Sequence, residues 1–225
     1  RVTEVPLSQT SGRDDRANPE LQISERVQGM PQALSIYINQ LVYDLRRMNR
    51  DIITLSLGEA FFQIPLFDFS RLDLEKCYHY SDSQGIPELR EKIADYYRTH
   101  YGASVEASEV LISAGSKPIL FMVMQCILNP GDEVVIHEPA WLSYKEQVRL
   151  VDGVARFIRY DCPIEQFPDN FTERTRIMII NNPNNPAGRI YTRANLSWLY
   201  RECRERGIYL LVDEAYSDFV ADESF

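Results

Sequence analysis

Short apolar runs alternate with helix-like segments through the second half of the chain. Five runs are rich in β-branched and aliphatic residues, at 110–113, 134–137, 155–160, 177–181 and 208–212. Most are separated by helical stretches, with apolar positions at helical spacing from Pro87 to Tyr101 and from Pro118 to Leu128. Runs that are apolar at every position are typical of parallel strands covered on both faces. The pattern predicts an α/β fold, a three-layer sandwich around a mostly parallel sheet.

The final helix has clear signals at both ends. Thr192 is placed to accept a hydrogen bond from the first helical turn, and Gly207 suits the residue that follows the last turn. On the face between them we expect four buried side chains, those of Leu196, Leu199, Tyr200 and Cys203.

The first half is less regular. Residues 1–28 are polar, dense in charge and without periodicity, which indicates an arm or a capping segment. From Ile36 the apolar positions fall on one helical face as far as Met48, and the run 52–55 reads as a short strand. A loop around Gly58 and Pro65 follows.

Composition narrows the class of partner. The 225 residues are 44% hydrophobic and 25% charged, enough to bury a core, and the net charge of −9 repels nucleic acids and anionic membranes. A small-molecule partner is therefore favoured. No apolar run approaches the roughly 20 residues of a membrane span, and the N-terminus lacks the layout of a signal peptide, so we expect a cytoplasmic protein.

The four cysteines carry no metal signature. Cys77, Cys126, Cys162 and Cys203 lie tens of residues apart, with no C-x-x-C pair and no histidine at ligand spacing. We interpret them as four buried thiols in a reducing compartment, and we expect no metal site.

Candidate chemistry gathers just after the strands, where open α/β sheets bind their ligands. The run 110–113 leads through Gly115, Ser116 and Lys117 into a helix, an arrangement that can bind an anion but that many βα loops share without a ligand. Trp141 follows the run 134–137 and reads either as a ring platform or as a core side chain. Asp213 ends the run 208–212 and needs a partner, either an arginine or a cationic ligand atom.

A seven-residue stretch after the run 177–181 has an unusual composition. Residues 182–188 read Asn-Pro-Asn-Asn-Pro-Ala-Gly. Amides flanked by prolines can hold one geometry and offer a ligand both a donor and an acceptor.

Six motifs, in this order, resemble the fold-type-I pyridoxal-phosphate aminotransferases, class I/II, of the aspartate aminotransferase-like group. The likeness runs from about Ile23 to the end of the chain. The motifs are LSLGEAFFQIP (55–65), YHYSDSQGIPELREKIADYY (78–97), VLISAGSKPILF (110–121), NPGDEVVIHEPAWLSY (129–144), IINNPNNPAGRIY (179–191) and YLLVDEAYSDF (209–219).

The resemblance implies how the cofactor, pyridoxal 5′-phosphate, is bound. It implies that Gly115, Ser116 and Lys117 hold the phosphate and that Trp141 stacks on the pyridine ring. Asn185 and Tyr216 would contact the phenolic oxygen. Asp213 would pair with the ring nitrogen and keep it protonated, which makes the ring an electron sink.

Two further residues concern the substrate and the partner subunit. Gly58 matches the loop that closes on the substrate α-carboxylate, and Tyr80 matches the tyrosine that crosses to the neighbouring subunit's phosphate, so the resemblance implies a homodimer. Ala187 stands where the family usually has threonine, and Ala60-Phe61 stand where Pro-Asp is common.

The catalytic lysine of the family has no counterpart in this chain. The family's Schiff-base lysine follows the DEAY motif in a Ser-x-x-Lys setting that none of the four lysines, Lys76, Lys92, Lys117 and Lys145, has. We therefore expect an N-terminal portion of an aminotransferase with no catalytic residue of its own, its large domain incomplete at the C-terminus. Residues 1–50 would form the arm and part of the small domain, and 51–225 the N-terminal part of the cofactor-binding large domain.

Other functions share these motifs. Carbon–sulfur lyases, aminocyclopropane-carboxylate synthase and some decarboxylases use the same loops for different reactions, and fold alone does not separate them. A non-catalytic cofactor-binding chain is disfavoured, because a chain ending at Phe225 would expose the edge of the last strand. A regulator domain is disfavoured by the acidic charge and by the lack of a basic helix-turn-helix. The amino acid and 2-oxo acid substrates stay open among dicarboxylic, aromatic and branched types.

Overall fold

The computed structural model describes residues 23–30, 34–55 and 66–220, with side chains from 36 in the second range. The chain divides into two compact units, Arg1–Pro31, which contains the short helix α1 (Glu25–Gln28), and Gln32–Phe225. The helices and strands described below all belong to the second unit, Gln32–Phe225.

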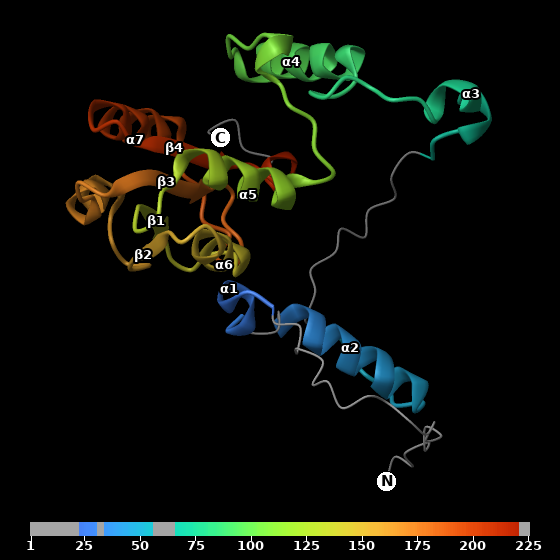
Figure 1. Cartoon of the computed structure of the whole chain (residues 1–225), viewed down its shortest axis with the longest axis horizontal. Helices are drawn as coiled ribbons and strands as arrows, with labels where there is room; N and C mark the ends of the chain where they lie inside the picture. The colour runs from blue at the N-terminus through green and yellow to red at the C-terminus, as the bar shows by residue number, and fades with distance from the viewer. Residues whose placement is uncertain (1–22, 31–33, 56–65, 221–225) are drawn as a thin grey trace, which may run out of the picture. The chain divides into compact units, whose positions relative to one another are not determined.

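Four parallel strands form the centre of this unit. They are β1 (Glu133–His137), β2 (Val154–Ile158), β3 (Thr175–Asn181) and β4 (Tyr209–Asp213), in the spatial order β2-β1-β3-β4 (Figure 1). The parallel sheet expected from the apolar runs is confirmed.

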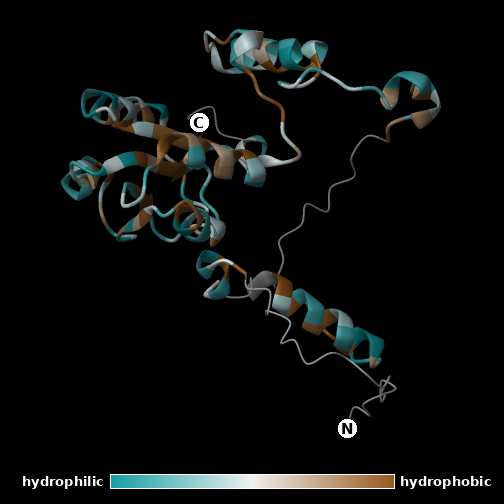
Figure 2. Ribbon diagram, in the orientation of Figure 1, coloured by the Kyte–Doolittle hydropathy of each residue, from teal (hydrophilic) through white to brown (hydrophobic). Residues whose placement is uncertain are grey.

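Helices cover the sheet on both faces. Helices α5 (Ser116–Ile127) and α6 (Ser143–Leu150) pack on one face with Val134 and Ile136 of β1. Helix α7 (Arg193–Glu205) and the 3-10 helix η3 (Ile164–Asn170) pack on the other face with Val135. Alternate residues of β1 thus pack into two separate hydrophobic cores, one on each face of the sheet, which confirms the three-layer sandwich. Figure 2 shows the hydrophobic colour along the central strands and a hydrophilic colour over much of α7.

Helix α7 has the ends that the sequence predicts. The Thr192 hydroxyl accepts a hydrogen bond from the Asn195 amide, and the Asn195 side chain accepts one from the Thr192 amide. Leu199 and Cys203 are fully buried. Tyr200, however, is 52% exposed, so its predicted burial is wrong. It lies one residue past Leu199, about 100° further round the helix, and therefore faces away from the sheet.

Two predicted strands do not form. The segment 110–113 is not part of the sheet, although Val110 is extended, and the Ile112 amide donates to the Gln84 carbonyl. The segment 52–55 is also irregular, with Ile53 and Leu55 88% and 92% exposed. Apolar, β-branched sequence favours extended backbone, but a strand needs a neighbour, and the part of the chain that the structure describes supplies none for these segments.

The helices before the sheet are α2 (Leu34–Arg47), α3 (Leu74–Cys77) and α4 (Pro87–Tyr101), with 3-10 helices η1 (Phe69–Arg71) and η2 (Ala107–Glu109); η4 (Ser217–Phe219) follows β4. The helix predicted from Pro87 to Tyr101 is confirmed, and Gly102 ends it in the left-handed conformation with φ 62°. No helix of the described residues is long and apolar enough to cross a membrane.

The prediction of four buried thiols is wrong. Cys203 is buried and Cys162 is half-buried, whereas Cys77 and Cys126 are exposed, and all four are free thiols. Cys126 lies on α5 on the side away from the sheet, where helix position and not residue type decides exposure. Within the described ranges no group of acidic, histidine or cysteine side chains could hold a metal ion.

Candidate functional site

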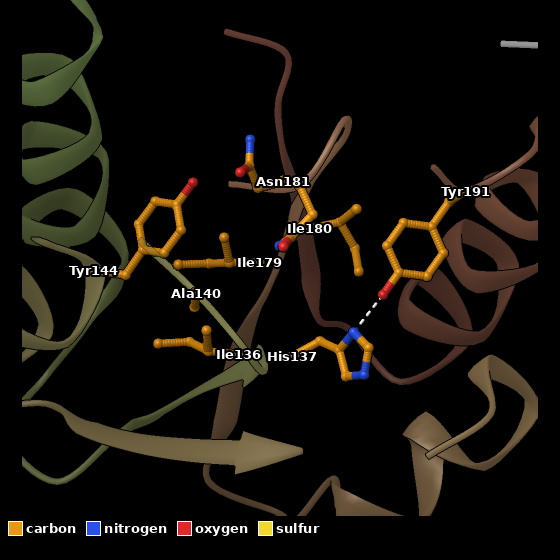
Figure 3. A pocket seen from close by; sticks show the side chains of 9 residues that line it. Ile136, His137, Ala140, Tyr144, Ile179, Ile180, Asn181 and Tyr191 are labelled. Atoms are coloured by element: carbon orange, nitrogen blue, oxygen red, sulfur yellow. Dashed lines mark hydrogen bonds between the residues drawn. The ribbon is translucent and has the colours of Figure 1, made fainter. Parts of the chain in front are cut away.

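The topological switch point of the sheet lies between β1 and β3: the next strand after β1 is added on one side of this pair, and the next strand after β3 on the other. From β1 the chain passes through α6 on one face to β2, and from β3 it passes through α7 on the other face to β4. Because the loops after β1 and β3 diverge, a crevice opens beyond the carboxyl ends of these strands, the usual place for a ligand in such sheets. A small pocket lies here, and Figure 3 shows Tyr144 on one side of the strand ends and His137 with Tyr191 on the other.

Asp213 ends β4 at this edge. Its Oδ2 accepts a hydrogen bond of 2.5 Å from the Tyr144 hydroxyl, and its Oδ1 accepts one of 3.1 Å from the Ala215 amide. Its backbone carbonyl accepts from the Asn181 side chain at 3.0 Å. Among the described residues no arginine pairs with the Asp213 carboxylate, and the donors to its two oxygens, the Tyr144 hydroxyl and the Ala215 amide, are neutral.

Tyr144 is a site residue that sequence reasoning missed. Burial and the hydrogen bond to Asp213 raise its pKa far above the usual range, so its hydroxyl stays a proton donor. Its ring packs edge-on against Trp141, with centroids 5.3 Å apart. Trp141 lies two residues before α6 and Tyr144 in its first turn, so no helical spacing in the sequence indicated that the two side chains meet.

Asn185 and Tyr216 are in contact, as their proposed shared oxygen requires. The Asn185 side chain donates to the Tyr216 hydroxyl at 3.2 Å. The Asn185 amide donates to Asn181 Oδ1 at 2.6 Å, which anchors the loop to the end of β3. The side chains of Asn181 and Asn185 thus connect the loop after β3 to the turn after β4.

The turn before α5 has the features of an anion site. Gly115 has φ 89°, and the space where a Cβ would project is open. Helix α5 begins at Ser116, and the amides of a first helical turn lack partners within the helix. Lys117 Nζ lies 4.9 Å from the centre of the Trp141 ring, which places this turn beside the tryptophan.

Direct contacts therefore connect most of the sequence-predicted site residues. A continuous path runs from Lys117 through Trp141, Tyr144, Asp213, Asn181 and Asn185 to Tyr216. Trp141 is half-buried at the edge of the core, not enclosed in it. Tyr80 is fully exposed, outside this path, and Gly58 lies outside the described residues.

Comparison with known proteins decides the family. The family model described as "Aminotransferase class I and II" matches residues 19–225. The chain belongs to this family. It is 37% identical over 204 residues to the aspartate/prephenate aminotransferase of Thermus thermophilus, covering 86% of this chain and 53% of that protein. It is 30% identical over 208 residues to an asparagine–oxo-acid transaminase of Streptococcus mutans, covering 88% and 53%.

Solved structures of the family share the fold. Aspartate aminotransferase from Thermus thermophilus with maleate superposes with a TM-score of 0.83 at 33% identity, over 91% of this chain and 56% of that one. Aspartate aminotransferase from Thermotoga maritima gives a TM-score of 0.80 at 29% identity, over 90% and 56%. The chain thus spans about half the length of the aminotransferases that it matches.

The residues present fit the cofactor of this family, pyridoxal 5′-phosphate. The open space at Gly115 and the first turn of α5 suit a phosphate, which accepts hydrogen bonds from backbone amides. The half-buried Trp141 offers a flat apolar surface, and the Asp213 carboxylate suits a protonated ring nitrogen.

Proposed function

We propose that the intact protein is a pyridoxal-phosphate-dependent aminotransferase, which moves an amino group between an amino acid and a 2-oxo acid. One observation carries the proposal: the continuous path of contacts that joins Lys117, Trp141, Asp213, Asn185 and Tyr216 at the carboxyl edge of a parallel sheet. Residues 51–225 would supply the N-terminal part of the large domain, and 1–50 the arm and part of the small domain.

In this proposal each side chain has one task. Amides of the turn 115–117 and the Ser116 hydroxyl bind the phosphate, and Trp141 fixes the plane of the ring. Asp213 holds a proton on the ring nitrogen, because its charge favours the cationic form. When bound, the cofactor withdraws electron density from the substrate's α carbon.

Asn185 and Tyr216 complete the proposed contacts. The Asn185 side chain has a second N–H beyond the one that it donates to Tyr216, and the Tyr216 hydroxyl, as acceptor of that bond, has its own proton to donate. Both can therefore donate toward one phenolic oxygen and hold the ring at its second edge.

Assembly is part of the proposal. Tyr80 is fully exposed on this chain, and we place it in the site of a second copy, in a cytoplasmic homodimer with shared sites. The loop with Gly58 is assigned to the substrate α-carboxylate. The covalent lysine is assigned to the part of the aminotransferase that lies outside residues 1–225.

The names of relatives guide the choice of substrate. The two relatives named above are an aspartate/prephenate aminotransferase and an asparagine–oxo-acid transaminase. We therefore propose aspartate and asparagine as the first donors to test, with 2-oxoglutarate as acceptor.

The test uses the full-length gene product. It is incubated with pyridoxal phosphate, reduced with borohydride, and examined by intact mass and peptide mapping. In the reduced sample we expect one pyridoxyl group on a lysine outside residues 1–225. In a separate, unreduced sample we expect the visible absorbance of the bound cofactor to decrease when aspartate is added. A full-length product that takes up no pyridoxyl group contradicts the proposal, and labelling without amino transfer favours a lyase or a decarboxylase.

A further inference from the structure

His137 ends β1 on the face opposite Tyr144 and is 5% exposed. Its Nδ1 is hydrogen-bonded to the Tyr191 hydroxyl, the dashed line of Figure 3. Its Nε2 lies 3.2 Å from the Arg159 carbonyl oxygen at the end of β2. The Arg189 guanidinium lies against the ring, with NH1 3.2 Å from Nδ1 and 3.0 Å from Nε2. His137 lines the small pocket at the strand ends, and none of the tasks proposed above makes use of it.

The partners determine the protonation state of the imidazole. A carbonyl oxygen only accepts, so the tautomer with its hydrogen on Nε2 donates to Arg159 and leaves Nδ1 to accept from Tyr191 and from Arg189. Burial and the adjacent Arg189 charge lower the pKa of His137 from 6.5 to about 4, so the ring is neutral near pH 7.

The surroundings of the ring contain one strong charge. The loop after β3 presents Arg189 and Tyr191, and the end of β2 presents the backbone of Arg159 and Tyr160. The Arg159 guanidinium is paired with Asp161 at 2.8 Å. Phe167 of η3 packs its ring 4.7 Å from the imidazole, and Glu138, next in the chain, is exposed.

The ring joins two loops that carry site residues. Residues 138–142 follow His137 directly and contain Trp141, while residues 182–191 contain Asn185 and end at Tyr191. Tyr191 is itself locked to the start of its loop, because its amide donates to Asn182 Oδ1 at 2.8 Å and its carbonyl accepts from Asn182 Nδ2 at 3.1 Å.

Two more contacts close the same junction. The Asn184 side chain donates to the Pro139 carbonyl at 3.1 Å, and the Asn184 amide donates to the Arg189 carbonyl at 2.8 Å. Arg189 also donates to the Tyr160 carbonyl at 2.5 Å. The loop after β3 is therefore fastened to both neighbouring strand ends, and His137 is a buried side chain at which contacts from Tyr191, Arg189 and the end of β2 meet.

We propose that His137 is a positioning residue that, through Tyr191 and Arg189, holds the Asn185 loop and the Trp141 loop at a fixed separation across the cofactor site. The inference rests on the proposed function, since the site that it serves is the pyridoxal-phosphate site. His137 touches neither cofactor nor substrate and acts through the two loops.

The first experiment measures pyridoxal-phosphate affinity and the visible circular dichroism of the bound cofactor in the full-length protein. His137→Phe removes both ring hydrogen bonds, and His137→Asn restores an acceptor where Nδ1 lay. We expect a loss of affinity of about 10-fold or more for H137F, in line with a buried hydrogen bond or two, and partial rescue by H137N. The matched control is His100→Phe, on an exposed residue of α4, which should bind like the parent.

The second experiment keeps the histidine and removes the charge beside it. In Arg189→Gln the burial that chiefly lowers the pKa of His137 remains, but the second cause, the Arg189 charge, is gone, so the pKa rises from about 4 without reaching 6.5, and a cationic ring cannot accept from Tyr191. As the pH is lowered, cofactor affinity of R189Q should therefore begin to fall at a higher pH than that of the parent, which a purely structural arginine would not cause. This variant also serves if H137F fails to fold.

The outcomes separate the two proposals. If the parent binds the cofactor and both H137F and R189Q match its affinity and its pH profile, only the positioning role is overturned. A parent that binds no pyridoxal phosphate overturns the proposed function, and this inference with it.

Discussion

Asp213 is a carboxylate at the end of a strand whose other side chains are apolar. Its two oxygens are held by a hydroxyl and by a backbone amide, both neutral donors, so the charge is oriented but not cancelled. An ion pair with arginine would have satisfied the same oxygens and left less attraction for a ligand cation. At the residue scale, Asp213 therefore presents a carboxylate that is held in one orientation by partners without charge.

Asp213→Asn tests that charge. The amide has nearly the same shape, so the fold should persist, while the rate of amino transfer should fall by about 10²-fold or more, the usual cost of losing one preorganised electrostatic partner. Stopped-flow spectroscopy of the reaction with aspartate measures it. Asp218→Asn, on the exposed carboxylate that accepts from Tyr96, is the control and should keep the parent rate. A parent-like rate in D213N would contradict the assigned role.

Tyr144→Phe removes only the hydroxyl that orients Asp213. A hydrogen bond to a charged group contributes about 1.5–3 kcal/mol, so we expect kcat to fall by about 10- to 100-fold with KM for the amino acid little changed. Tyr209→Phe, at an exposed tyrosine of β4, is the matched control. Equal kcat in Y144F and the parent would show that Asp213 needs no orienting hydroxyl.

His137 predicts a pH dependence of stability. The pKa is about 4 in the folded state and near 6.5 when unfolded, so between these values the unfolded chain binds the extra proton. Folding stability should therefore be fully present above about pH 6.5 and decline as the pH falls toward 4. Urea unfolding at several pH values should show this decline in the parent and a shallower one in H137N. Parallel declines would assign the effect to other groups.

At the element scale, helix ends are where the sequence predicts best. Thr192 and Gly207 were identifiable because capping depends on residues within one turn of each other.

Thr192→Ala should lower the free energy of unfolding by about 1 kcal/mol and the Tm by about 2–4 °C. Ser197→Ala, in the middle of α7 and exposed, should leave the Tm unchanged or slightly higher, and calorimetry distinguishes the two. If T192A and S197A had the same Tm, the Thr192 cap would make no measurable contribution to stability.

Strands were predictable only where a neighbour exists. The apolar runs of β1, β3 and β4 pair as expected, but the equally apolar segment 110–113 stays outside the sheet, because pairing depends on residues distant in the sequence. The same limit applies to the site. The order of strand ends indicated Trp141, Asn185 and Asp213, whereas the bond from Tyr144 to Asp213 joins positions 69 residues apart, which no local pattern reveals.

At the scale of the whole molecule, Tyr80, which we propose for the site of a partner subunit, is fully exposed and lies outside the contact path from Lys117 to Tyr216. Mixing subunits tests its place in a partner. In a dimer of a Y80A subunit and a D213N subunit, a crossing Tyr80 leaves one site with both residues intact. Random mixing should restore activity to about a quarter of the sites.

If Tyr80 instead serves its own subunit, no site in the mixed dimer is intact, and mixing restores nothing. Native mass spectrometry on the same samples, with a mass tag on one of the two subunits, verifies that subunits exchange. Mixed samples without regained activity would contradict the shared site.

The strand order has a consequence for the growing chain. β1, the first of the four described strands along the chain, lies inside the sheet, between β2 and β3. During translation it can pair with β2 soon after α6 emerges, but its other edge stays bare until β3 has left the ribosome. Because domains begin to fold from the N-terminal side as they are made, the carboxyl edge is assembled late, and the loops that hold Trp141 and Asn185 come together only after β3 has paired with β1.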